Sequence, residues 1–151
     1  MDEKNVPLRV VDLRTSFVTK KKTVKAVDGV NFEIEAGKVI GIVGESGCGK
    51  SVTSLSIMHL LSPNAQVDPN SHVYLNGRDV LHLSEKEWIQ IRGKEIAMIF
   101  QDPMTSLNPT MTIGKQIEET ILLHSSCTKK EASQRALEML NNTEFTVRVL
   151  K

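Results

Sequence analysis

The segment from Gly44 to Ser51 reads GESGCGKS, and it restricts the possible folds more than any other feature of the chain. It satisfies GxxxxGK[ST] in full, a pattern that joins a buried strand to the first turn of a helix. The flanking sequence suits that context. Residues 39–43 (VIGIV) are apolar, which predicts a central strand covered on both faces. A helix is predicted from Lys50 to Leu61, ended by Ser62-Pro63-Asn64.

The positions of this loop suit the binding of nucleotide phosphates. Glycines let the backbone curl so that successive N–H groups point at phosphate oxygens, and the following helix adds the positive end of its dipole. Lys50 is predicted to carry charge to the β- and γ-phosphates, and Ser51 to bind Mg²⁺. The predicted phosphate-binding residues are Gly44, Glu45, Ser46, Gly47, Cys48, Gly49, Lys50, Ser51 and Val52. Glu45, Ser46 and Cys48 are expected to act through their backbone.

Strand patterns occur on both sides of the loop, so an α/β fold is expected. Val30, Phe32 and Ile34 alternate with polar residues, which predicts a half-buried strand. Further strands are predicted at 8–13, 72–75 and 96–100, a hairpin tip or loop at 19–25, turns at 36–37 and 76–77, a polar loop at 66–71 and irregular structure at 101–111.

Three more helices are predicted after the loop. The spacing of Ser84 with Glu87, and of Thr128 with Glu131, is that of a capping box, so a helix is expected to begin at each pair. Gly93 should end the first of these helices. Residues 113–124 are predicted to be helical as well.

Composition and charge narrow the class of protein. The 151 residues carry 19 basic and 18 acidic side chains, and this near-balance argues against a nucleic-acid partner. The N-terminus has no apolar core, and no apolar stretch is long enough to cross a bilayer, so neither a signal peptide nor a membrane span is expected. Cys48 and Cys127 are expected to be free thiols. The four histidines form no spacing motif, and each is expected at the surface: His59, His72, His82 and His124.

Three stretches resemble a known family. They are residues 26–51 (AVDGVNFEIEAGKVIGIVGESGCGKS), 96–117 (IAMIFQDPMTSLNPTMTIGKQI) and 135–140 (RALEML). Over residues 6–140 the chain resembles the ATP-binding subunits of ABC transporters, and within them the oligopeptide, dipeptide and nickel importers. The string QDPMTSLNP at 101–109 is the most specific piece.

The resemblance implies a fold and two further site residues. The fold is an incomplete P-loop NTPase core of ABC type, with an antiparallel β subdomain and the start of a helical subdomain. Gln101 falls at the family's Q-loop glutamine, which touches Mg²⁺ and the attacking water and so is assigned a catalytic and a metal-binding role. Phe17 falls at the aromatic residue that stacks on adenine. An alternative in which Asp102 ends a Walker B strand is weaker, because Gln101 precedes it and Pro103 follows.

The resemblance also implies a division of the chain and a set of partners. Residues 1–103 would form the N-terminal part of the nucleotide-binding domain, 104–140 the Q-loop exit and partial helical subdomain, and 141–151 a divergent tail. ATP and Mg²⁺ would be the cofactors. The partners would be a second ABC ATPase subunit in a head-to-tail dimer, two transmembrane permease subunits and an extracytoplasmic peptide-binding protein. The chain would then lie on the cytoplasmic face of the membrane.

Several family motifs are missing from the sequence. It contains no LSGGQ-type signature, no Walker B aspartate with its catalytic glutamate, and no switch histidine. A truncated chain that cannot hydrolyse ATP alone is therefore expected. The leading hypothesis is the N-terminal portion of a peptide-importer ATPase. A non-catalytic remnant or regulatory nucleotide-binding module is the second hypothesis, and a small P-loop kinase is the third.

Overall fold

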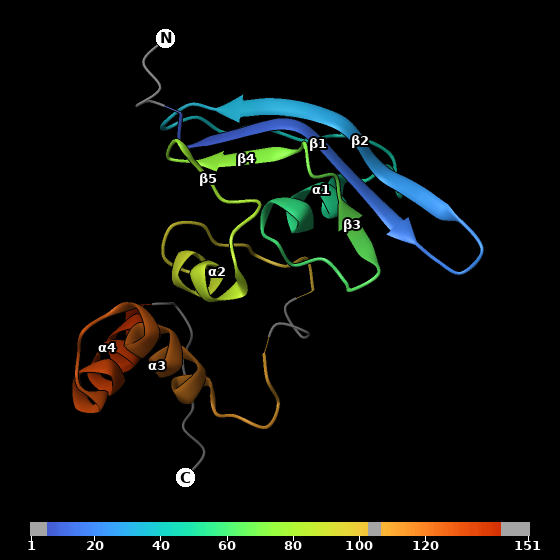
Figure 1. Ribbon diagram of the computed structural model, residues 1–151. Helices are drawn as coiled ribbons and strands as arrows, with labels where there is room; N and C mark the ends of the chain where they lie inside the picture. The colour runs from blue at the N-terminus through green and yellow to red at the C-terminus, as the bar shows by residue number, and fades with distance from the viewer. Residues whose placement is uncertain (1–5, 103–106, 143–151) are drawn as a thin grey trace. The chain divides into compact units, whose positions relative to one another are not determined.

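The computed structural model describes residues 6–102 and 107–142 (Figure 1). The chain divides into two compact units, Met1–Ile89 and Gln90–Lys151. The predicted tail at 141–151 lies outside the described residues except for Asn141 and Asn142, as does the middle of the predicted irregular segment, at 103–106.

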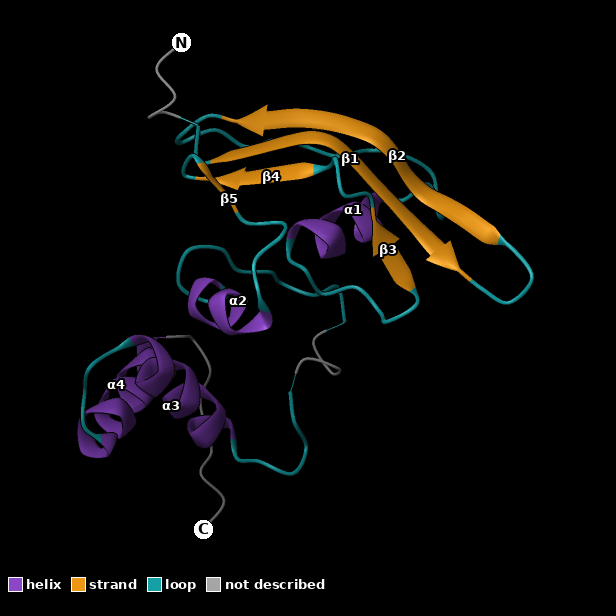
Figure 2. Cartoon of the chain, in the orientation of Figure 1, coloured by secondary structure: helices purple, strands orange, loops and turns teal. Residues whose placement is uncertain are grey.

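An antiparallel sheet forms most of the first unit (Figure 2). Its strands are β1 (Leu8–Val18), β2 (Thr23–Ile34), β3 (Ala65–Val67), β4 (His72–Leu75) and β5 (Arg78–Asp79). The order is β2-β1-β4-β5, and β3 pairs with the other end of β1. Strand β1 therefore holds three other strands together.

The hairpin of β1 and β2 confirms the half-buried strand and, in part, the predicted tip at 19–25, because residues 23–25 already belong to β2. Its tip runs through the lysine-rich segment, where Thr19 Oγ1 donates to the carbonyl of Lys22 at 2.7 Å. Val30, Phe32 and Ile34 lie half-buried on β2 between exposed neighbours. Strand β1 is longer than predicted because its polar second half pairs with β2 and β3.

Helix α1 (Lys50–Ile57) packs against β1. Thr15 Oγ1 of β1 lies 2.8 Å from Ser56 Oγ of α1, and both residues are fully buried. Apolar residues complete the core around them: Val10, Leu13, Val27, Ile57, Val73, Val80 and Leu81. The helix that carries the phosphate loop is therefore fixed to the sheet by both apolar packing and a buried hydrogen bond.

Helix α1 ends four residues earlier than predicted, at Ile57. The N–H of Leu60 donates to the carbonyl of Leu55, and the N–H of His59 donates to that of Ser56. These two bonds form a Schellman motif, with His59 left-handed at φ 52°. Glycine usually occupies that position, so a histidine there does not indicate the end of a helix.

The capping predictions are confirmed. Ser84 donates from its N–H and its hydroxyl to the Glu87 carboxylate at 3.0 and 2.8 Å, next to α2 (Glu85–Ile91). In the second unit, α3 (Ile113–His124) has the predicted bounds, and its N-cap is Thr112. Thr128 and Glu131 form the equivalent box at α4 (Lys129–Asn142).

Two predicted strands are wrong. Residues 39–43 form no strand, and Val39 and Val43 are 96% and 95% exposed. Residues 96–100 contribute only a bridge between Arg92 and Ile96, and Ile99 is 98% exposed. A strand needs a hydrogen-bonded neighbour, and within 6–102 and 107–142 no strand pairs with either segment. The predicted polar loop at 66–71 is partly wrong, because β3 includes its first two residues.

Candidate functional site

The phosphate loop enters α1 through two left-handed glycines. Gly47 has φ 81° and Gly49, the N-cap of the helix, has φ 97°. A Cβ on Gly49 would lie 2.4 Å from the carbonyl oxygen of Ala26 on β2, closer than atoms can approach. The end of the loop is therefore pressed against the sheet, and only glycine fits both the conformation and the space.

The side chain of Lys50 closes the loop on itself. Its Nζ donates to the carbonyl oxygens of Gly44 at 2.6 Å and Glu45 at 2.7 Å. The sulfur of Cys48 is 3.5 Å away. These carbonyls accept from the ammonium group and hold it at the exposed start of the loop.

The Cys48 side chain lies close to the glycine at the start of the loop. A Cβ on Gly44 would lie 2.6 Å from Cys48 Sγ. Cys48 is exposed and unbridged, as predicted for a free thiol.

The first turn of α1 presents backbone donors. The earliest helical bond runs from the N–H of Thr53 to the carbonyl of Gly49 at 2.8 Å. By helix geometry, the N–H groups of Lys50, Ser51 and Val52 have no partner within the helix. The first turn carries no acidic side chain that would offset the positive end of the helix dipole. The site can therefore hold an anion such as a phosphate group.

The other two predicted site residues belong to other segments of the chain. Phe17 is half-buried on β1, where it pairs with Val24 of β2 and Ala65 of β3. Gln101 is exposed in irregular structure and belongs to the second unit. Their assigned roles at a nucleotide stay predictions.

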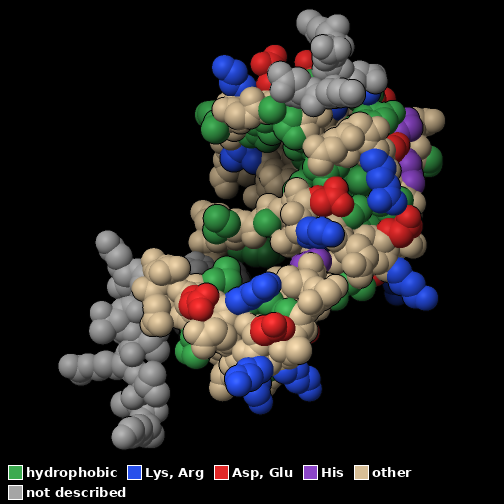
Figure 3. Space-filling view, turned by 90° about the vertical axis from the view of Figure 1, so that its left-hand side faces the viewer, with side chains coloured by type: hydrophobic (Ala, Val, Ile, Leu, Met, Phe, Trp, Pro, Cys, Tyr) green, Lys and Arg blue, Asp and Glu red, His purple; other side chains and the backbone are tan. Residues whose placement is uncertain are grey.

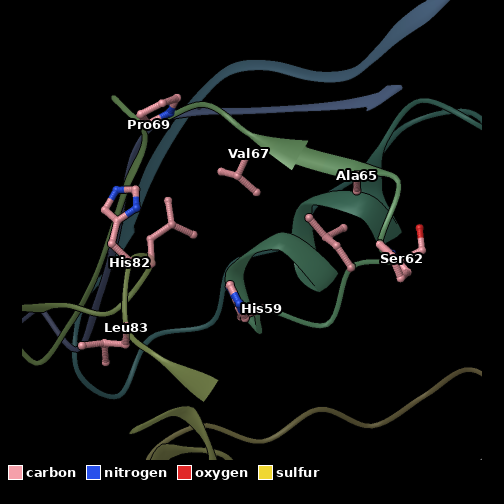
Figure 4. Close-up of a pocket in the computed structure, with 10 residues that line it drawn as sticks. His59, Ser62, Ala65, Val67, Pro69, His82 and Leu83 are labelled. Carbon is pink, nitrogen blue, oxygen red and sulfur yellow. The ribbon is translucent and has the colours of Figure 1, made fainter. Parts of the chain in front are cut away.

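A separate pocket of about 520 Å³ lies in the first unit (Figure 4). Its wall comes from the segment after α1, from β3 and from the segment after β5. The lining residues are His59, Leu61, Ser62, Pro63, Ala65, Val67, Pro69, Leu81, His82 and Leu83. None of them belongs to the phosphate loop.

Sequence reasoning missed one cluster of polar side chains. His72, Asp79 and His82 each offer a potential metal-ligand atom, and these atoms all lie within 4.8 Å of one another. Figure 3 shows histidine side chains at the molecular surface close to acidic ones. The available signal was the Asn76-Gly77 turn, which folds the chain back and brings residues on its two sides together.

A comparison with protein families shows which family the chain belongs to. The family model described as ABC transporter matches residues 27–151. The chain belongs to the ABC transporter family. This match includes the segment 141–151, whose divergence stays a prediction.

Curated ABC transporter relatives are similar over most of this chain. The oligopeptide transport ATP-binding protein AppD of Bacillus subtilis is 47% identical over 92% of this chain and 42% of its own length. OppD of the same organism, also an oligopeptide transport ATP-binding protein, is 50% identical over 88% of this chain and 37% of its own. The dipeptide transport ATP-binding protein DppD of Lactococcus lactis is 50% identical over 88% of this chain and 38% of its own length. The chain thus spans about 40% of the length of such relatives.

Solved structures show the same fold. A dimeric bacterial ABC transporter cassette matches with a TM-score of 0.76 and 25% identity, over 93% of this chain and 59% of that one. A dimeric post-hydrolysis ATP-binding cassette bound to ADP and Pi matches with a TM-score of 0.72 and 23% identity, over the same shares. The predicted fold class, an incomplete ABC-type ATPase with an antiparallel β subdomain, is confirmed. Among the described residues, no helix is both long and apolar enough to cross a membrane.

Proposed function

We propose that this chain binds MgATP through residues 44–52 and belongs to a peptide-importing ABC transporter. The observation that carries the proposal is the arrangement of Lys50, whose ammonium group is held by the Gly44 and Glu45 carbonyls beside the N-terminus of α1. A cation next to unpaired helix N–H groups suits the β- and γ-phosphates of a nucleotide. The printed names of the relatives, which refer to peptide transport and ATP binding, support the substrate class.

Each site residue receives a specific role in this proposal. Lys50 contacts the terminal phosphates, and Ser51 supplies a hydroxyl to Mg²⁺. Phe17 stacks on adenine. Gln101 reaches Mg²⁺ and the attacking water when the catalytic site is assembled. The division at 1–103, 104–140 and 141–151 belongs to the same proposal.

The proposal also includes a set of protein partners. A second ABC ATPase subunit contributes its signature loop, two permease subunits form the membrane path, and an extracytoplasmic binding protein delivers peptide. The assembled complex lies at the cytoplasmic face of the membrane. The dimeric state of the solved cassettes supports the first of these partners.

Binding without turnover is the expected behaviour of this chain by itself. Its sequence has no Walker B aspartate and no following glutamate to orient the attacking water. The exposed segment at 39–43, which directly precedes the phosphate loop, also pairs with no strand in the part of the chain that the structure describes. The second candidate, a nucleotide-binding regulatory module without hydrolysis, rests on these two observations.

Calorimetric titration of the chain with MgATP tests the binding proposal. Lys50→Ala should weaken binding at least about tenfold, since hydrogen bonds to charged groups contribute about 1.5–3 kcal/mol. Lys38→Ala is the matched control, because it removes an exposed lysine outside the loop. Equal affinity of Lys50→Ala and wild type would overturn the assignment. Sustained phosphate release that Lys50→Ala abolishes would exclude the non-hydrolysing candidate.

A further inference from the structure

We propose that His72, Asp79 and His82 form a binding site for a divalent transition metal ion such as Zn²⁺. The three residues lie on and just after the β4–β5 hairpin in the first unit, and none of them belongs to the phosphate loop. One ligand atom from each lies within 4.8 Å of the other two, a separation that a single ion can span with small side-chain adjustments.

The hairpin register places His72 and Asp79 on one face. Tyr74 pairs with Asp79 across the two strands, so their side chains point the same way. His72 precedes Tyr74 by two residues and therefore shares that face. Val73 and Leu75 are buried on the opposite face, at 0% and 6% exposure. This register makes His72 and Asp79 diagonal neighbours, with His72 Nδ1 2.7 Å from Asp79 Oδ2.

A buried anchor brings His82 to the same place. Its Nε2 lies 3.1 Å from the carbonyl oxygen of Ser71, and its ring meets that of His72 edge-on, with centroids 6.0 Å apart. Ser71 is fully buried, and its hydroxyl donates to the carbonyl of Asp12 at 2.9 Å and accepts from the N–H of Arg14 at 3.0 Å. His82 is thus held by the carbonyl of a fully buried residue directly before β4.

The remaining contacts of these side chains are those expected around a metal. When the His82 ring donates from Nε2 to Ser71, its neutral form keeps a lone pair on Nδ1 for a metal. Asp79 Oδ1 accepts from the N–H of Leu81 at 3.1 Å, which fixes the carboxylate plane. Metal-binding histidines commonly donate their second ring nitrogen to a carbonyl or a carboxylate, and ligating carboxylates are themselves hydrogen-bonded.

The donor set selects the class of ion. Two imidazole rings and one carboxylate suit Zn²⁺, Ni²⁺ or Cu²⁺, whereas Mg²⁺ and Ca²⁺ prefer oxygen ligands only. The His72 and Asp79 side chains are 38% and 29% exposed, so an ion can enter and water can complete its coordination. This site is therefore chemically distinct from the Mg²⁺ proposed at Ser51.

Titration of the chelator-treated chain with ZnSO₄, followed by calorimetry, tests the proposal. We expect saturable binding at one ion per chain, weakened at least about tenfold by His72→Ala or His82→Ala. Asp79→Asn keeps the side-chain shape and should also weaken binding. His59→Asn is the matched control, because it removes a histidine outside the cluster from a left-handed position that asparagine tolerates. Its affinity should equal that of wild type.

A second measurement uses NMR spectroscopy of the wild-type chain, so its result does not depend on whether the variants fold. When Zn²⁺ is added to the wild-type chain, the imidazole NMR signals of His72 and His82 should shift in parallel, while those of His124 stay unchanged. Two results would overturn the site: no shift at His72 and His82, or binding that is lost in Cys48→Ser or Cys127→Ser and kept in the histidine variants. The second result would mean thiol binding only, with His72 and Asp79 forming an ordinary ion pair.

Discussion

Gly49 meets two constraints that come from different parts of the chain. Its φ of 97° is set by the turn into α1, and its missing Cβ makes room for the Ala26 carbonyl of β2. Gly47, in the same loop, shares the left-handed conformation at φ 81°, but a Cβ there would meet no atom within 4 Å. The pattern GxxxxGK[ST] required the second of these glycines and left the first as a variable position.

This difference between the two glycines makes a matched pair of variants. Gly49→Ala should lower the free energy of unfolding more than Gly47→Ala, because both incur the left-handed cost of about 1–2 kcal/mol and only Gly49→Ala also displaces β2. Urea denaturation of each variant measures the difference. We also expect Gly49→Ala to bind MgATP more weakly than Gly47→Ala. Equal destabilisation by the two substitutions would contradict the close approach to Ala26.

At the scale of elements, the sequence predicted best those that carry their own stop and start signals. The capping boxes at Ser84 and Thr128, the hairpin turn at Asn76-Gly77 and the helix at 113–124 depend on contacts within a few residues, and each is confirmed. The predicted strands at 39–43 and 96–100 depend on neighbours elsewhere in the chain. Apolar sequence alone cannot supply such a neighbour, so these two predictions were wrong.

In the candidate site too, features that depend on nearby residues were predictable and features that depend on distant residues were not. The helix start at Lys50 was predictable because a local pattern encodes it. The approach of Gly49 to Ala26 was not predictable, because tertiary packing brings those residues together. The role of Gln101 remains a prediction of the family resemblance.

The buried hydroxyl pair that joins α1 to β1 should show energetic coupling. Thr15→Val removes the hydroxyl that contacts Ser56 and should cost about 1 kcal/mol of unfolding free energy. Ser56→Ala should cost at least as much, since Ser56 also donates to the Val52 carbonyl. The double variant should cost less than the sum of the two, and a double-mutant cycle by urea denaturation measures this. Additive losses would show that the two hydroxyls act independently.

The capping box of α4 predicts a dependence on pH. The pKa of Glu131 is lowered by hydrogen bonds from the backbone N–H and then the hydroxyl of Thr128. A lowered folded pKa means that this carboxylate stabilises the helix above the ordinary glutamate pKa, and that the contribution is lost as the pH falls through the lowered value. The protection of the α4 amides from hydrogen exchange, corrected for the intrinsic exchange rate at each pH, should therefore fall as the solution is acidified below about pH 4.3.

Glu131→Gln isolates that effect. Glutamine can still accept from Thr128 but does not titrate, so the acid-dependent loss of protection in α4 should shrink in this variant. Glu138→Gln, on the same helix and outside the cap, should leave the acid response unchanged. An acid response in Glu131→Gln equal to that of wild type would assign it to another carboxylate.

At the scale of the whole molecule, one residue reports on the folding of the first unit. Trp88 is the only tryptophan in the sequence. It is fully buried on α2 and stacks on His59 with ring centroids 5.7 Å apart. The phosphate loop, the sheet and the proposed metal site all belong to this unit, so we expect the fluorescence of Trp88 to report on its unfolding.

Truncation of this ring should be the most damaging substitution of those proposed. Trp88→Ala should lower the free energy of unfolding by about 3–5 kcal/mol, the usual cost of deleting a large buried aromatic side chain. Trp88→Phe keeps a ring and should cost less. Circular dichroism during urea denaturation measures both variants without the tryptophan signal. A loss in Trp88→Ala no larger than in Trp88→Phe would contradict its place in the core.

The central position of β1 has a consequence for the order of folding events. The Arg14 N–H meets the Ser71 hydroxyl across 57 residues of chain, and Thr15 meets Ser56 across 41. Closing such long segments costs chain entropy before any contact compensates for it, which slows folding relative to local hairpins and helices. The phosphate loop lies inside the closed segment. During synthesis it should therefore take its binding shape only after β4 has left the ribosome and paired with β1.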